Sequence, residues 1–141
     1  MAQWEHRIEI EAPPVRVWNV LSDVASWPEW TDSILSVADV SEAFGLGGTA
    51  TVHARGTPKS RYTVTTWEPG RGFDWETKTR GARAIARHWI EGAGEGRCTV
   101  TLTVEIPGPL AVLFKPFISR GIVENLETEA AGLKARSEAE H

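Results

Sequence analysis

The chain has 141 residues, 41% hydrophobic content and a formal net charge of −4, which predicts one globular domain over residues 1–141. Its lone cysteine, Cys98, excludes an internal disulfide and a cysteine-ligated zinc site, and no run approaches the ~20 apolar residues of a membrane span. Charged residues interrupt the N-terminus, so we find no secretion signal and expect a cytoplasmic protein without stable membrane insertion.

The N-terminal segment predicts a strand followed by two short helices. Over residues 3–11, Trp4 and Ile8 belong to a set that alternates with charged side chains, which is typical of a half-buried strand. Pro13 and Pro14 end this strand and suit the first turn of a helix that reaches Ser22. Residues 24–30 predict one further helical turn.

Residues 33–106 predict a continuous antiparallel meander. Stretches rich in Val, Thr and aromatic residues alternate with Gly and Pro turns, which indicates strands over 34–40, 49–55, 61–67, 73–79, 82–91 and 97–106. In the last of these strands, apolar residues alternate strictly with Thr and Glu. One face of the sheet must therefore be covered.

The C-terminal segment predicts a long amphipathic helix that provides this cover. Apolar residues recur mostly every four positions, at Phe114, Ile118, Ile122, Leu126, Ala130 and Leu133. Three glutamates, Glu124, Glu127 and Glu129, lie off this stripe and are expected to face solvent. Pro116 predicts a bend or a break near Lys115. The expected fold class is therefore α+β.

Several motifs resemble those of the START-like (SRPBCC) superfamily, in particular its polyketide cyclase/dehydrase and lipid-transport branch. They cover nearly the whole chain: residues 8–13 with Val17 and Trp18, Trp27 to Trp30, Gly48-Thr49, residues 68–71, residues 97–101, residues 107–110 and residues 129–134. The resemblance implies a helix-grip fold, in which a seven-stranded curved antiparallel sheet wraps around the last helix. It also implies a cavity for an apolar small molecule between sheet and helix.

His88 is the candidate catalytic residue, because an imidazole in such a cavity could polarise a carbonyl or remove a proton next to one. If residues 82, 84, 86, 88 and 90 form the buried face of their strand, the small alanines leave room for a ligand beside His88. In the alternative register Ile85 and Trp89 face inward and His88 is exposed. His53 poses the same question on its own strand.

Aromatic residues are abundant, with seven Trp, and flat walls suit a flat or chain-like apolar ligand, although each ring is also ordinary core filler. The ligand-binding residues predicted from these arguments are Trp30, His53, Arg55, Tyr62, Phe73, Trp75, Ala86, His88, Phe114, Phe117 and Ile118.

No motif indicates a metal site, a bound cofactor, a phosphate-binding loop or a nucleophile elbow, and the negative charge argues against nucleic acid. The expected partner is a hydrophobic ligand (lipid, isoprenoid or polyketide-like), and a homodimer is left open. Two hypotheses follow. A binding protein would have a dry aromatic cavity, whereas a polyketide cyclase or dehydratase would bring two or more polar groups together there.

Overall fold

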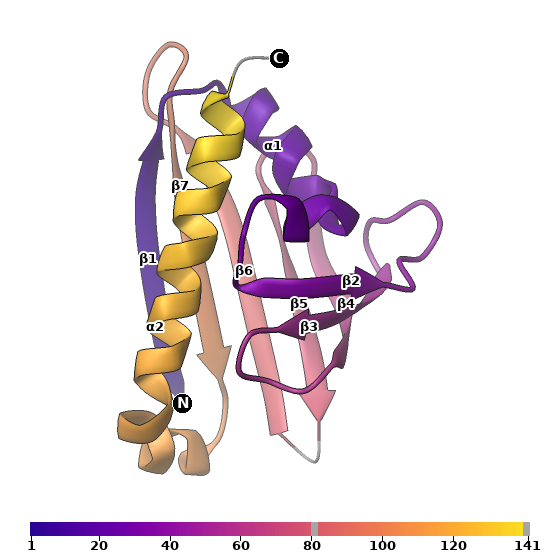
Figure 1. Ribbon diagram of the computed structural model, residues 1–141, viewed down its shortest axis with the longest axis vertical. Helices are drawn as coiled ribbons and strands as arrows, with labels where there is room; N and C mark the ends of the chain where they lie inside the picture. Colours follow the sequence, from indigo (N-terminus) through magenta and orange to yellow (C-terminus); the bar gives the residue numbers. More distant parts are fainter. Residues whose placement is uncertain (80–81, 140–141) are drawn as a thin grey trace.

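The computed structural model describes residues 1–79 and 82–139, and its elements follow the expected order (Figure 1). They are β1 (Ala2–Ile10), α1 (Pro14–Ser22), the 3-10 helix η1 (Val24–Glu29), β2 (Ile34–Ala38), β3 (Thr49–Ala54), β4 (Ser60–Glu68), β5 (Gly72–Thr79), β6 (Ala82–Gly92), β7 (Cys98–Ile106) and α2 (Pro109–Glu138). The expected α+β helix-grip architecture is confirmed.

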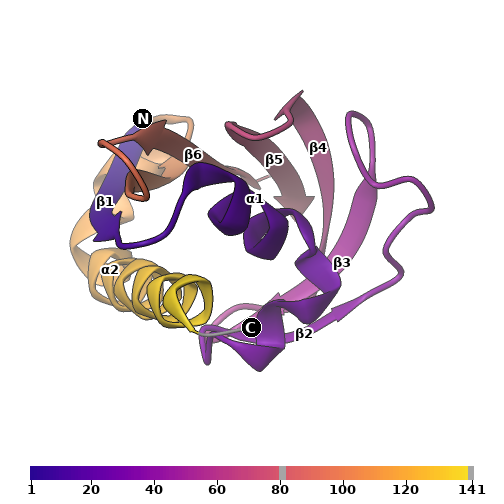
Figure 2. The same cartoon turned by 90° about the horizontal axis from the view of Figure 1, so that it is seen from above.

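The seven strands form one antiparallel sheet in the order β1-β7-β6-β5-β4-β3-β2. Consecutive strands from β2 to β7 pair with one another, whereas β1 pairs with β7, with Ile8 opposite Val100. The sheet curls, so that seen from above it surrounds α1 and faces α2 across its concave side (Figure 2).

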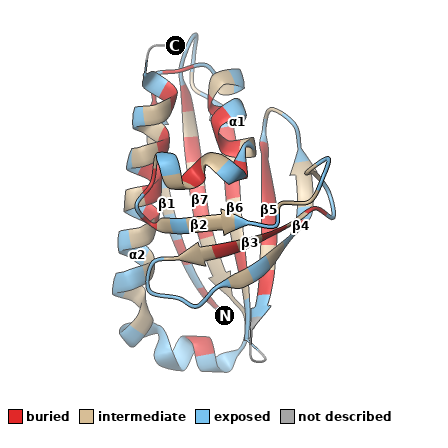
Figure 3. Ribbon diagram, turned by 45° about the vertical axis from the view of Figure 1, so that its right-hand side comes forward, coloured by how far each residue is buried: buried red, intermediate tan, exposed pale blue. Residues whose placement is uncertain are grey.

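The core lies between this concave face and the helices. β7 contributes buried Cys98, Val100 and Leu102, which are the residues that alternate with Thr in the sequence. Helix α2 contributes Leu126 and Leu133, among others, and its buried residues face the sheet (Figure 3). Helices α1 and η1 close one end of the core with Val17, Leu21, Val24 and Trp27.

Helix α2 is continuous across Pro116, so a break near Lys115 is wrong, but its first turns run across the end of the molecule before the rest follows the sheet (Figure 3). Because of this bend, the first residues of the predicted apolar stripe are exposed and do not face the sheet. Phe114 is 51% exposed and Phe117 is 82% exposed, because the first turns diverge from the sheet that covers Leu126 and Leu133. In the described part of the chain, no helix combines the length and the apolar character that crossing a membrane requires.

A glycine allows α2 to pack tightly against the corner that follows η1. A Cβ atom placed on Gly132 would overlap the backbone carbonyl oxygen of Trp30. Gly121, on the same helix, has open space at the equivalent position. Gly132 is therefore the residue that lets the corner approach α2.

The outer face of the sheet carries a charged network centred on Arg87. Its guanidinium contacts Asp74 Oδ2 at 2.7 Å and Glu105 Oε2 at 2.7 Å, and the indole of Trp89 donates to Asp74 Oδ1 at 2.7 Å. Asp74 is almost fully buried, so these partners take the place of water around its carboxylate.

Candidate functional site

A cavity of about 200 Å³ lies between the concave face of the sheet and α2. Most of its wall is apolar, and the polar side chains on it include Tyr62, His88, Asn125 and Glu129. The apolar lining comes from η1, the sheet and α2: Trp27, Ile34, Val52, Ala54, Trp75, Ala84, Ala86, Val104, Ile106, Ile122 and Leu126.

The register of β6 is the one that turns His88 inward. Ala84, Ala86 and His88 line the cavity together, and the small alanines leave the space beside the imidazole. Tyr62 and Trp75 also line the cavity, with ring centroids 4.9 Å apart. Phe73 is buried and does not line the cavity; its ring stacks on that of His88 at 4.5 Å.

The structure places His53 and Arg55 away from the cavity lining, contrary to prediction. Val52 and Ala54 of β3 line the cavity, so by the alternation of a strand His53 points to the opposite face. Arg55 lies just beyond β3, and its guanidinium donates to Asn125 Oδ1 at 3.1 Å and to Thr128 Oγ1 at 3.2 Å on α2. Asn125 returns a hydrogen bond to the Arg55 carbonyl at 2.9 Å, so the Arg55 contact ties β3 to the helix beside the cavity.

The four remaining predicted ligand-binding residues, which belong to α2 and to the corner after η1, do not line the cavity either. Phe114 and Phe117 are exposed because of the bend in α2. Ile118 packs against the core without lining the cavity. Trp30 lines a separate hollow beside α1.

His88 is held as a neutral imidazole. It is 2% exposed, and burial lowers its pKa to about 4, although a hydrogen bond between Nδ1 and the Phe73 carbonyl at 3.2 Å opposes this shift. Because a carbonyl only accepts, Nδ1 carries the proton and Nε2 is left as an acceptor. The lone pair on Nε2 faces α2.

Glu129 stands opposite His88, and sequence reasoning missed it by assigning it to the solvent face. It is 9% exposed, and burial raises the pKa of its carboxyl to about 7. Its Oε1 lies 4.0 Å from His88 Nε2. A signal was present: Ile122, Leu126, Glu129 and Leu133 are separated by four, three and four residues, which is the spacing of one helical face.

Together these groups make one polar end in an apolar cavity. The 4.0 Å separation of His88 and Glu129 is longer than a hydrogen bond. A protonated Glu129 can donate a hydrogen bond and neutral His88 can accept one, so a hydroxyl group of a ligand could bond to both, whereas a ligand carbonyl could accept only from Glu129. The phenol of Tyr62 belongs to the same environment, because burial and the Glu129 carboxylate both raise its pKa.

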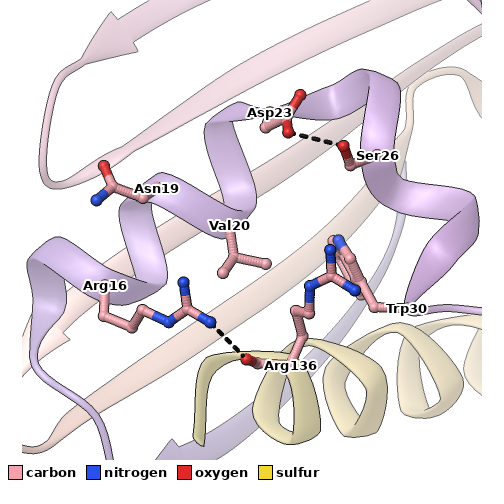
Figure 4. Close-up of a pocket in the computed structure, with 7 residues that line it drawn as sticks. All are labelled: Arg16, Asn19, Val20, Asp23, Ser26, Trp30 and Arg136. Atoms are coloured by element: carbon pink, nitrogen blue, oxygen red, sulfur yellow. Dashed lines mark hydrogen bonds between the residues drawn. The ribbon is translucent and has the colours of Figure 1, made fainter. Parts of the chain in front are cut away.

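A second hollow, of about 120 Å³, lies between α1, η1 and the end of α2 (Figure 4). Its polar groups largely satisfy one another. Arg16 donates to the Arg136 carbonyl at 3.1 Å, Arg136 donates to Glu29 at 2.9 Å, and Ser26 donates to Asp23 at 2.7 Å. Within residues 1–79 and 82–139, no three His, Cys, Asp or Glu side chains are grouped so that they could hold a metal ion.

Residues 1–138 match the family model described as polyketide cyclase / dehydrase and lipid transport. An uncharacterized protein of Mycobacterium tuberculosis is 28% identical over 125 residues, which cover 82% of this chain and 75% of that protein.

Solved structures share the fold. The Zhui aromatase/cyclase from Streptomyces sp. R1128 has a TM-score of 0.78 at 15% identity, covering 97% of this chain and 93% of that one. A START superfamily protein from Mycobacterium smegmatis has a TM-score of 0.76 at 15% identity, covering 96% and 97%. The di-domain aromatase/cyclase BexL, from the BE-7585A biosynthetic pathway, has a TM-score of 0.75 at 20% identity; 98% of this chain is covered, but it spans only 47% of BexL.

Proposed function

Because the chain belongs to the polyketide cyclase/dehydrase and lipid transport family, we propose that it binds an apolar small molecule that carries a polar group at one end. The observation that carries this proposal is the cavity itself, whose wall is mostly apolar and whose titratable groups gather around His88 and Glu129. Apolar walls supply affinity, and a few placed polar groups fix orientation.

The size of the cavity restricts the ligand. Its volume of about 200 Å³ is below the roughly 300–1,000 Å³ of ordinary small-molecule pockets. The ligand is therefore compact, or the cavity widens when α2 moves away from β3. The aromatic rings of Trp27, Tyr62 and Trp75 favour a molecule with a flat or extended apolar part.

Native mass spectrometry of protein purified without detergent, followed by organic extraction, tests this function. We expect a stoichiometric hydrophobic adduct in the parent protein. Ala86→Leu should lose the adduct because the added atoms fill the cavity, whereas Ala131→Leu, at an exposed position on α2, should keep it. Equal occupancy in the two variants would show that the adduct lies elsewhere, and an adduct-free parent that also fails to bind added lipids and polyketides would refute the proposal.

The His88–Glu129 pair favours a second candidate, a cyclase or dehydratase. Neutral His88 could take a proton from the carbon beside a ligand carbonyl, while protonated Glu129 donates a proton to the carbonyl oxygen that the new carbon–carbon bond turns into a hydroxyl. Loss of that hydroxyl as water would complete a dehydration. This is the acid–base chemistry that aldol-type ring closure requires.

Paired variants separate catalysis from binding. His88→Gln and Glu129→Gln keep the size and polarity of the wall but remove the base or the acid. If the protein is an enzyme, both variants should bind a poly-β-ketone substrate within a few-fold of the parent and lose roughly 10²–10⁴-fold in turnover. Absence of turnover in the parent protein would leave binding as the function.

A further inference from the structure

The first turns of α2 expose a continuous apolar face. Leu110, Leu113, Phe114 and Phe117 are separated by three, one and three residues, which places them on one side of a helix, and each is more than half exposed. We call these four residues the docking face. Exposed apolar clusters of this kind mark interaction sites, whereas single exposed apolar residues are ordinary.

The opposite side of the same turns is anchored to the protein. Ala111 is buried and Ile118 packs against the core. The indole of Trp4 donates a hydrogen bond to Ser119 Oγ at 2.9 Å, which also ties the helix to β1. These contacts fix the first turns of α2 against the protein, so the docking face points away from the sheet.

The charge around the docking face differs from that of the chain. Residues 109–123 contain Lys115 and Arg120 but no acidic residue, although the whole chain has 19 Asp and Glu against 15 Lys and Arg. The guanidinium of Arg120 is 90% exposed and pairs with Glu124 at 3.2 Å, whereas Lys115 lies over the Trp4 ring on the anchored side of the helix. An apolar helix face that is flanked by the exposed cation of Arg120, within a segment that has no acidic residue, fits an anionic lipid surface.

Position in the fold adds a second argument. Ile106 comes just before α2 and Ile122 follows the first turns, and both line the cavity. The docking face therefore adjoins the cavity where β7 passes into α2. A second copy of the chain fits less well, because a twofold contact through this face would bring the cations of the two copies together.

We propose that the first turns of α2 dock onto a bilayer that contains anionic phospholipid, with Leu113, Phe114 and Phe117 inserted among the lipids and Arg120 at the headgroups. Docking does not depend on what the cavity holds. Exchange of a ligand between bilayer and cavity would rest on the proposed function as well.

Vesicle flotation tests the proposal. The parent protein should float with phosphatidylcholine vesicles that contain phosphatidylglycerol and much less with pure phosphatidylcholine. Phe117→Ser and Leu113→Ser should each weaken binding roughly tenfold, and Arg120→Gln roughly fivefold. Leu46→Ser is the matched control, because Leu46 is 73% exposed and Leu113 65%, but Leu46 lies in the loop between β2 and β3, away from α2 (Figure 1).

Other outcomes overturn the proposal. These are no flotation of the parent, equal losses in Leu113→Ser and Leu46→Ser, or a dimer in sedimentation velocity that Phe117→Ser dissociates while vesicles bind neither protein. All these positions are exposed, so circular dichroism should show that the variants are folded. Ala86→Leu should still float, which separates failure of docking from failure of the proposed function.

Discussion

Glu129 Oε1 lies 4.0 Å from His88 Nε2 at the polar end of the cavity, and burial moves the pKa values of the two groups in opposite directions. The pKa of Glu129 rises from 4.5 to about 7, and the pKa of His88 falls from 6.5 to about 4. Both groups are therefore neutral in the folded protein near pH 5.5. Neither is charged inside an apolar wall.

Opposing contributions to stability follow from this pair. The contribution of Glu129 is present below about pH 4.5 and is lost as the pH rises through about 7, because the folded state holds the proton more tightly. The contribution of His88 is present above about pH 6.5 and is lost as the pH falls through about 4. Between pH 4.5 and 6.5 the two slopes cancel in the parent protein.

Single variants should reveal each slope. Relative to the parent, the free energy of unfolding of Glu129→Gln should rise with pH between 4.5 and 6.5, by up to about 1.4 kcal/mol per unit. That of His88→Gln should fall over the same range. Urea unfolding at a series of pH values measures both. Curves parallel to that of the parent would contradict the burial of both groups.

The Arg55 contact is expected to control ligand release, because it joins β3 to α2 beside the cavity. Removing it with Arg55→Ala should raise the dissociation rate of a bound ligand roughly tenfold and change the free energy of unfolding by less than about 1 kcal/mol. Trp27 and Trp75 on the wall can report release by stopped-flow fluorescence. Arg61→Ala, which removes a 3.1 Å bond to Thr49 between β3 and β4, should leave the rate unchanged. Equal rates in the two variants would exclude this role for Arg55.

Gly132→Ala should destabilise the protein by about 2 kcal/mol or more, because the new methyl group meets the Trp30 carbonyl and the corner must move. Gly121→Ala is the matched control on the same helix. It has open space, and should stabilise by roughly 0.5–1 kcal/mol through helix propensity. Thermal unfolding of both variants measures the difference. A gain of stability in Gly132→Ala would mean that η1 and α2 are not packed this closely.

Arg87→Ala should cost about 3 kcal/mol, because buried Asp74 loses the cation at 2.7 Å. Arg83→Ala removes a comparable ion pair with Glu76 at 2.6 Å, but the guanidinium there is more exposed, and the loss should stay below about 1 kcal/mol. Chemical denaturation compares them directly. Similar losses would show that Asp74 does not depend on Arg87.

Much of the fold follows from local patterns in the sequence. The alternation in β7 and the Gly and Pro turns predict the strands to within a few residues, because a sheet with one buried face must alternate. The register of β6 does not follow, since both of its faces carry apolar residues: Ile85 and Trp89 on one, Ala86 and Ile90 on the other. What decides it is tertiary contact, with Trp89 bonded to Asp74 outside and His88 stacked on Phe73 inside.

The site was predictable only in part. Tyr62, Trp75, Ala86 and His88 line the cavity as expected. Glu129 was missed because a strict four-residue stripe drifts around a helix that has 3.6 residues per turn. It therefore departs from the face of Ile122, Leu126 and Glu129, which lines the cavity. Phe114 and Phe117 were misplaced because the direction of α2 after the bend is set by the sheet, which local sequence does not reveal.

Because β1 pairs with β7, the sheet can be completed during synthesis only after β7 has emerged. β1 leaves the ribosome before the other strands, yet the strand that completes its hydrogen bonds ends at Ile106, and the helix that covers both runs on to Glu138. Until then the nascent chain can form only the hairpins between sequence neighbours, and loop closure across about a hundred residues delays the last step. The apolar face of β1 therefore stays open to chaperones until residues up to Glu138 have been synthesised.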